Sequence, residues 1–265
     1  MENLNELLLT SIHVSIEAGF RIMEVFHNKI HISIKRNLTP VTNADKLANE
    51  IIVNKLQPFN IPIISEESKN APYEERRKWE YCILIDPLDG TKEFIARRDE
   101  FTVNIALIHN NKPIMGVIYA PAMDLLYFAA PDFGSYRLRN ASAIINEATT
   151  IESILANSTA LPDITTATYT YLVSRSHVNH KTRKYLKTIK GDKEYIHKGS
   201  SLKLCAIAEG SANEYPRFGK TMEWDIAAGD AILSYAGGKV QIYEGAGLLT
   251  YNKADLGNPE FIASR

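Results

Sequence analysis

The chain has 265 residues, of which 45% are hydrophobic and 23% are charged, close to the average for globular proteins. Its 30 Lys and Arg residues almost balance 31 Asp and Glu residues, so the formal net charge is -1. This composition argues against a disordered chain, a collagen-like repeat, and a general nucleic-acid-binding protein with its usual basic excess. The length allows one large domain or two smaller ones.

The two cysteines, Cys82 and Cys205, both lie in apolar runs and cannot build a disulfide framework or a Cys-rich zinc site. We expect them to be buried thiols in a reducing cytoplasm. The N-terminus lacks the basic region of a signal peptide, and the apolar stretch 115–123 contains Gly and Pro. That stretch is also far shorter than the ~18 residues of a membrane span. We therefore expect a cytoplasmic protein without an integral membrane segment, and peripheral association with the inner membrane surface stays open.

The N-terminal half predicts two helices followed by strands. Apolar residues recur at helical spacing over 4–26, and a second helix is expected over about 42–57. Apolar runs that end in acids predict short buried strands at 61–65 and 80–85. Stretches rich in β-branched and aromatic residues predict an antiparallel meander over 101–109, 114–120 and 125–130.

The C-terminal half alternates short strands with helices, which favours an α/β arrangement. The strands are expected at 168–173, 195–197, 212–216 and 239–243, and the helices at 179–189, 201–209 and 225–236. A polar, weakly patterned stretch near 140–160 suggests a boundary. We therefore predict an α/β (α+β) protein, a layered sandwich in which an antiparallel half, residues 1–150, joins a mixed half, residues 151–265, to form one catalytic unit.

Acidic residues follow two neighbouring predicted strands, as Glu66-Glu67 and as Asp86-Pro87-Leu88-Asp89-Gly90-Thr91. Strand ends are where α/β proteins place their chemistry, and carboxylates held this close repel unless a cation lies between them. Oxygen ligands without His or Cys select hard ions such as Mg²⁺. Two such ions about 3.5–4 Å apart can hold the attacking and leaving oxygens of a phosphoryl transfer. An ordinary acidic turn is the alternative.

Several other residues each allow two interpretations. Thr91 begins a predicted helix, whose N-terminus could hold a phosphate, or Thr91 could simply cap it. Asp45 fits a capping box with Thr42, and Asp225 is a natural N-cap before Ile226. Gly229 inside a helix indicates close packing or a constrained site.

These pieces occur in a recognisable order along the chain: Asp45 after Pro-Val-Thr, Glu66-Glu67, the 86–91 segment, Trp224-Asp225 and Gly237-Gly238. Together they resemble the metal-dependent, lithium-sensitive phosphatases of the inositol monophosphatase superfamily. The resemblance extends from Pro40 to Gly238. It implies a layered α/β/α/β/α sandwich of the sugar-phosphatase type and two or three Mg²⁺ ions.

The resemblance also implies a role for each acidic residue. Glu66, Asp86 and the Leu88 carbonyl would hold the first Mg²⁺, and Asp86, Asp89 and Asp225 the second. A third, weaker ion would use Glu66 and water. No covalent nucleophile is needed in such a site.

The implied catalytic pair is Asp45 and Thr91, which would orient and deprotonate the attacking water. The reacting phosphate would lie across residues 88–91.

Further segments resemble the branch of the superfamily that acts on nucleoside bisphosphates. They are Lys92-Glu93-Phe94, Ser174-Arg175-Ser176-His177, Lys198 to Cys205, and Tyr215-Pro216-Arg217-Phe218-Gly219. This implies hydrolysis of the 3'-phosphate of adenosine 3',5'-bisphosphate to AMP, in sulfur assimilation, with the 5'-phosphosulfate analogue as a second substrate. The partner would be a small nucleotide, with no nucleic acid and no obligate protein partner. The implied substrate-binding residues are Glu66, Leu88, Asp89, Gly90, Thr91, Ser174, His177, Gly199, Ser201, Lys203, Arg217 and Asp225.

Two alternatives accompany that interpretation. The serine-rich segments could be helix caps and Lys203 a solvated lysine. The same chemistry could act on an inositol or sugar phosphate, although Lys92-Glu93 argues against this.

Overall fold

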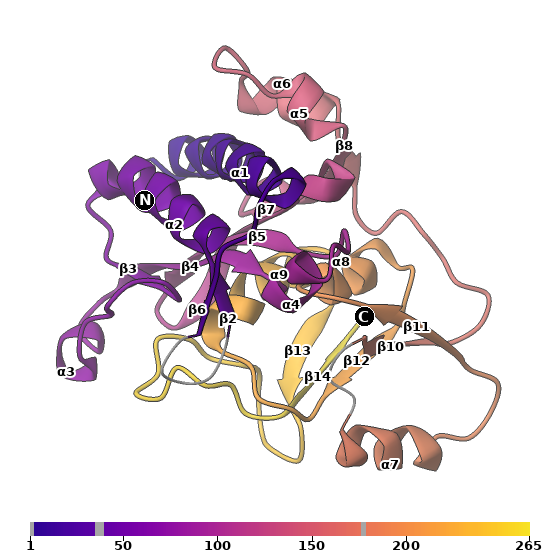
Figure 1. The fold of residues 1–265 in the computed structure, drawn as a ribbon. Helices are drawn as coiled ribbons and strands as arrows, with labels where there is room; N and C mark the ends of the chain where they lie inside the picture. Colours follow the sequence, from indigo (N-terminus) through magenta and orange to yellow (C-terminus); the bar gives the residue numbers. More distant parts are fainter. Residues whose placement is uncertain (1–2, 35–39, 176–178) are drawn as a thin grey trace.

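A computed structural model describes residues 3–34, 40–175 and 179–265. Two large β-sheets alternate with three helical layers, which gives an α/β/α/β/α sandwich, and β1 and β2 pair in a separate two-stranded sheet (Figure 1). The predicted fold class is confirmed. Cys82 and Cys205 are buried free thiols, as expected. Within the described ranges, no helix combines the length and the apolar character that a membrane crossing requires.

The first layer packs two amphipathic helices on the seven-stranded sheet. Their buried faces include Leu8, Ile12 and Ile52, which join the core beneath them. A capping box fixes the start of the second helix, because the Thr42 backbone N–H donates to Asp45 Oδ2 at 2.8 Å. The elements are α1 (Leu4–His27), β1 (Ile32–Ile34), β2 (Pro40–Thr42), α2 (Asn43–Leu56) and η1 (Gln57–Phe59).

The larger sheet has the order β3-β4-β5-β6-β7-β8-β9. The β3–β4 pair is parallel and all other pairs are antiparallel, so the expected meander is confirmed. The strand predicted to end at Ile85 instead runs on through the acidic segment. The strands are β3 (Ile63–Ser65), β4 (Tyr81–Asp89), β5 (Thr102–His109), β6 (Lys112–Ala120), β7 (Leu125–Ala130), β8 (Gly134–Arg139) and β9 (Thr159–Ala160).

Short helices occupy the connections of this first half. They include two helices in the polar stretch near 140–160, where the sequence pattern indicated none. They are α3 (Tyr73–Arg76), α4 (Thr91–Ile95), η2 (Pro121–Met123), α5 (Ala141–Ile144) and α6 (Ile151–Ala156).

Two helices, α8 (Leu202–Glu209) and α9 (Glu223–Tyr235), fill the space between the sheets. Apolar residues on several faces of α8 and α9 are buried, as a central layer requires. The prediction for Gly229 is confirmed, because a Cβ on Gly229 would lie 2.7 Å from Leu204 Cβ.

The smaller sheet has the order β11-β10-β12-β14-β13 and mixes parallel and antiparallel pairs, as expected. Helix α7 packs on its outer face through Leu186. The second sheet begins at Thr170, and the division of the chain at residue 150 stays a prediction. The elements are β10 (Thr170–Ser174), α7 (His180–Thr188), β11 (Glu194–Lys198), β12 (Glu214–Arg217), β13 (Lys239–Ile242) and β14 (Phe261–Ser264).

Candidate metal and phosphate site

Three carboxylates from distant parts of the chain converge at one point. Glu66 follows β3, Asp86 lies in β4, and Asp225 lies in the first turn of α9. One carboxylate oxygen of each lies within 4.8 Å of the others. The Glu66 backbone N–H donates to the Ile85 carbonyl at 3.2 Å, which ties the end of β3 to β4.

The electrostatics of Asp86 call for a cation. Its side chain is 2% exposed, and Leu88 N donates to its Oδ1 at 3.1 Å. Burial raises the pKa of Asp86 well above its usual range, and repulsion from Glu66, Asp89 and Asp225 adds to this. An all-oxygen donor set of this kind fits a hard divalent ion such as Mg²⁺. The residues present therefore fit the metal site that the sequence predicts.

The pKa of Asp225 is also raised, and its position in the helix cap differs from the prediction. Burial, together with repulsion from Asp89, raises the pKa of Asp225 to about 8. The N-cap of α9 is Met222, and Asp225 is the third helical residue, where its Oδ2 accepts the Met222 backbone N–H at 2.8 Å. The N-cap prediction was wrong by three residues because Asp is favourable at both positions.

The fourth predicted carboxylate, Asp89, lies next to this cluster but is engaged by serines. The hydroxyls of Ser200 and Ser201 each donate to Asp89 Oδ2 at 2.7 Å. These hydroxyls are the ones that the sequence suggested for an anion. The structure instead directs them to a carboxylate.

Asp45 and Thr91 are in contact, as the predicted catalytic pair requires. Thr91 Oγ1 donates to Asp45 Oδ1 at 3.2 Å and lies 3.3 Å from the Leu88 carbonyl. Asp45 is also the capping residue of α2, which confirms the capping interpretation, and its catalytic role stays a prediction. Burial raises the pKa of Asp45, while hydrogen bonds from Thr42 and Thr91 act in the opposite direction.

A cavity of about 270 Å³ opens over these groups. Gly90 lies in its wall with φ +91°, and a Cβ there would lie 2.9 Å from the Glu100 carbonyl, so the turn requires glycine. The predicted site residues that line this cavity are Glu66, Asp86, Leu88, Asp89, Gly90, Thr91, Ser174, Gly199, Ser201, Lys203, Arg217 and Asp225. Asp45 reaches it through Thr91, and His177 lies outside the described residues.

Two cations line the same cavity as the carboxylates. Lys203 is 8% exposed, and its Nζ donates to the Ser200 carbonyl at 2.5 Å and lies 5.5 Å from the Tyr215 ring centroid. Burial lowers the pKa of Lys203 to about 8. Arg217 donates from Nη2 to the Lys220 carbonyl at 3.0 Å, whereas its buried Nε has no partner in the described structure. That free donor suits an anionic oxygen.

The two residues of the Ser174-Arg175 motif have different contacts. Ser174 lines the cavity, but Arg175 forms a forked ion pair with Glu100, at 2.7 Å from Nε and 3.0 Å from Nη2. Glu100 also accepts the Gly199 backbone N–H at 2.9 Å. The ion pair therefore joins three loops around the cavity mouth.

Several lining residues were not among the predicted site residues: Ser200, Tyr215, Lys220 and Thr221. Ser200 and Tyr215 stood inside segments that the sequence analysis had singled out. Lys220 and Thr221 carry no local signal beyond their nearness to Arg217.

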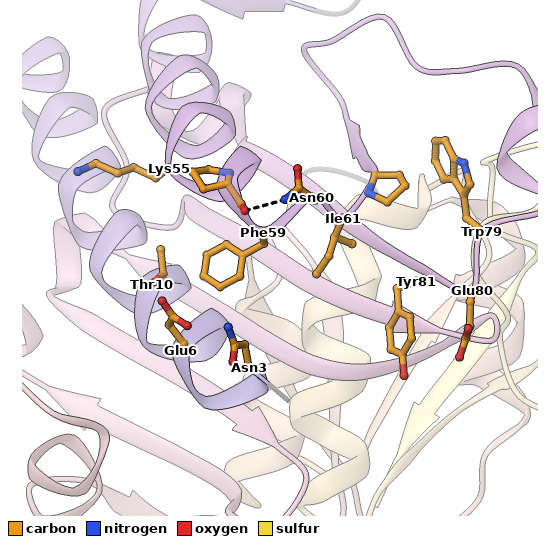
Figure 2. A pocket seen from close by; sticks show the side chains of 12 residues that line it. Asn3, Glu6, Thr10, Lys55, Phe59, Asn60, Ile61, Trp79, Glu80 and Tyr81 are labelled. Atoms are coloured by element: carbon orange, nitrogen blue, oxygen red, sulfur yellow. Dashed lines mark hydrogen bonds between the residues drawn. The ribbon is translucent and has the colours of Figure 1, made fainter. Parts of the chain in front are cut away.

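A second, larger cavity of about 870 Å³ lies elsewhere, between the first turns of α1, the end of α2 and the start of β4. Figure 2 shows Phe59 and Ile61 among its walls, with Tyr81 and Trp79 farther along. None of the predicted site residues lines it. The smaller cavity therefore remains the candidate site.

Comparison with known proteins agrees with this geometry. Residues 3–265 match the model of the inositol monophosphatase family. The chain belongs to that family. It is 44% identical to a 3'(2'),5'-bisphosphate nucleotidase CysQ of Buchnera aphidicola subsp. Acyrthosiphon pisum, over 87% of this chain and 82% of the relative. Identity to the CysQ protein of Escherichia coli (strain K12) is 38%, over 93% and 95% of the two chains.

A solved structure of CysQ from Bacteroides thetaiotaomicron, described as a bacterial member of the inositol monophosphatase family, has the same fold. The TM-score is 0.92 at 39% identity, covering 100% of this chain and 98% of the other.

Proposed function

We propose that this family member is a Mg²⁺-dependent 3'(2'),5'-bisphosphate nucleotidase. It hydrolyses the 3'-phosphate of adenosine 3',5'-bisphosphate to give AMP and phosphate. The 5'-phosphosulfate analogue is a second substrate, which places the enzyme in sulfur metabolism, and lithium inhibits it. The nucleotidase names of relatives that match over most of the chain support this assignment.

One structural observation carries the proposal. One cavity is lined both by the carboxylates Glu66, Asp86 and Asp225 and by two cations, Lys203 and Arg217. A substrate with two phosphates matches this lining, since one phosphate can lie by the metal site and the other by the cations. A monophosphate would leave Lys203 and Arg217 without an anion.

The carboxylate groups would hold the metal. Glu66, Asp86 and the Leu88 carbonyl are assigned to one Mg²⁺, and Asp86, Asp89 and Asp225 to another. Bound Mg²⁺ supplies positive charge that offsets repulsion between the phosphate and its nucleophile and stabilises the leaving 3'-oxygen.

Asp45 and Thr91 would move the proton. Because Thr91 Oγ1 donates its hydrogen to Asp45 Oδ1, its lone pairs are available to a water in the cavity. As that water attacks phosphorus, its proton passes to Thr91 Oγ1 while the Thr91 proton passes to Asp45. Burial makes Asp45 a better proton acceptor than an exposed aspartate. The bond from phosphorus to the 3'-oxygen breaks, the departing 3'-oxygen takes a proton from solvent water, and Asp45 afterwards returns its proton to solvent.

The second phosphate and the nucleoside would contact other residues of the cavity lining. Lys203 and Arg217 are assigned to the 5'-phosphate, with Gly199 and Ser201 beside it and Ser174 and His177 nearer the nucleoside.

A phosphate-release panel tests the proposal directly. The purified protein with Mg²⁺ is assayed on adenosine 3',5'-bisphosphate, inositol 1-phosphate, fructose 1,6-bisphosphate and 5'-AMP. We expect the first substrate to have the highest kcat/KM by a wide margin. A preference for either sugar phosphate would replace the nucleotidase assignment with the alternative that the sequence left open.

A further inference from the structure

Two buried polar residues on β5 lie directly opposite the acidic segment of β4. In the antiparallel register, Asn104 pairs with Asp86 and Thr102 pairs with Asp89. The two aspartates are three positions apart in the sequence but their partners are only two positions apart, so the ladder shifts between them. Such bulges redirect side chains beside active sites. Thr102 is 0% exposed and Asn104 is 1% exposed.

These two residues are linked by hydrogen bonds to the serines that hold Asp89. Thr102 Oγ1 lies 2.5 Å from Ser200 Oγ, and Asn104 Nδ2 donates to Ser201 Oγ at 2.6 Å. Thr102 Oγ1 also lies 2.9 Å from Asn104 Oδ1, so its one hydrogen can be donated either to Asn104 or to Ser200. A continuous chain of polar contacts therefore runs from β5, through the Ser200–Ser201 turn, to the Asp89 carboxylate on the neighbouring strand β4.

The Ser200–Ser201 turn is built for this contact rather than for capping α8. Ser201 is the N-cap residue of α8, yet its side chain makes no capping hydrogen bond. Ser200 has φ +51°, a left-handed conformation that is costly for a residue other than glycine. Backbone strain of this kind persists where the surroundings hold it, and here polar contacts hold both hydroxyls.

The two carboxylate oxygens of Asp89 differ in their hydrogen bonds. Oδ2 accepts from both serines, whereas Oδ1 has no hydrogen-bond donor among the described residues. Because hydrogen bonds to one oxygen restrict rotation of the carboxylate, they also fix the orientation of the other oxygen.

We propose that Thr102 and Asn104 are positioning residues that act through Ser200 and Ser201 to fix Asp89 for cation binding. The inference rests on the proposed function only in taking Asp89 as a metal ligand. Partners of this kind orient metal-binding side chains, and their loss typically reduces metal affinity about 10–100-fold.

The test is calorimetric titration of Mg²⁺ into the substrate-free protein. Thr102→Val keeps the shape of the side chain but removes the hydroxyl, and we expect Mg²⁺ affinity to fall about 10–100-fold. Thr102→Ser restores the hydroxyl and should bind Mg²⁺ nearly as the parent does. A Thr102→Val protein that binds Mg²⁺ as well as or better than the parent would overturn the proposal.

A second pair separates positioning from stability, and it decides the question even where Thr102→Val fails to fold. Ser200→Gly removes the hydroxyl and also relieves the left-handed strain, whereas Ser200→Ala removes the hydroxyl and keeps the strain. We expect both variants to lose Mg²⁺ affinity alike, with Ser200→Gly at least as stable as the parent in thermal unfolding. Affinity that follows melting temperature rather than loss of the hydroxyl contradicts the proposal.

Failure of the proposed function is distinguishable from failure of this inference. An inactive parent protein in the phosphate-release panel leaves the comparison of Mg²⁺ affinities intact.

Discussion

Asp45 is a helix cap to which we also assign a catalytic role. Its Oδ2 accepts from Thr42 and secures the start of α2, while its Oδ1 accepts from Thr91. In the proposed mechanism each oxygen therefore has a different role. A substitution at Asp45 would change both stability and rate, whereas one at Thr91 would change the proposed proton transfer without removing the cap.

We expect Thr91→Val to lower kcat by about 10²–10⁴, the usual contribution of a positioned proton acceptor. Thr91→Ser keeps the hydroxyl and should retain most of the rate. Steady-state phosphate release and Mg²⁺ titration of both variants check this. A large loss of Mg²⁺ affinity with kcat intact would assign Thr91 to the metal instead.

The two cations predict a selective loss of affinity for one phosphate. A hydrogen bond to a charged group is worth about 1.5–3 kcal/mol, so Lys203→Ala or Arg217→Ala should reduce kcat/KM for adenosine 3',5'-bisphosphate about 10–150-fold. Turnover of 3'-AMP, which lacks the second phosphate, should hardly change. Arg183→Ala, on the exposed face of α7, serves as the matched control. Equal losses on both substrates would show that these residues support the fold or the metal site.

At the scale of elements, the close contact between α8 and α9 sets the distance between their N-terminal ends, where candidate site residues lie. Both helices begin at the cavity, with Ser201 and Asp225, and they touch where Gly229 meets Leu204. A larger residue at Gly229 would push the helices apart.

Gly229→Ala therefore tests this packing. Alanine gains about 1 kcal/mol in helix propensity, but overpacking a filled core typically costs about 1–3 kcal/mol, and here the new Cβ would lie 2.7 Å from Leu204 Cβ. We expect a lower urea midpoint. Adding Leu204→Ala removes the atoms at 2.5 and 3.1 Å, and should recover part of the loss as a coupling energy. A single variant as stable as the parent would contradict the packing argument.

Sequence patterns predicted the helices and strands that are determined by residues within the same segment. The helical stripe of α1, the capping box of α2 and the apolar runs of β4 and β5 are all confirmed, because spacing and caps act within one segment. The acidic clusters also indicated where the site lies, since strand ends collect polar ligands.

The elements that sequence missed depend on distant partners. Strand β14 is four residues long and lies between β12 and β13, so only the neighbouring strands define it. The chain of contacts through Asn104 had no local signal either. Asn104 stands in an apolar run, and its meaning comes from the register with Asp86 and from a turn almost a hundred residues away.

At the scale of the whole molecule, the fold brings repelling carboxylates together in a buried place. Glu66 follows β3, Asp86 and Asp89 lie in β4, and Asp225 lies in α9 of the other half of the chain. Their electrostatics oppose folding unless protons or cations neutralise them. Stability of the metal-free protein should therefore depend on pH through this cluster.

The sign follows from Asp225, whose pKa rises from 3.8 to about 8 through burial and the nearby Asp89. Between about pH 4 and 8 the unfolded chain releases this proton while the folded, metal-free protein keeps it, so stability falls as pH rises. We expect the melting temperature without metal to decrease from pH 5.5 to about 8.

Mg²⁺ binds the deprotonated carboxylates, so the melting-temperature increase that it produces should grow over the same pH interval. Differential scanning fluorimetry at several pH values, with Mg²⁺ and with a chelator, measures both trends. Asp225→Asn is the control: it keeps an acceptor for the Met222 N–H but cannot ionise, so its metal-free curve should be flatter. An Mg²⁺ effect that is constant across pH in the parent, or equal in the variant, would remove Asp225 from the metal site.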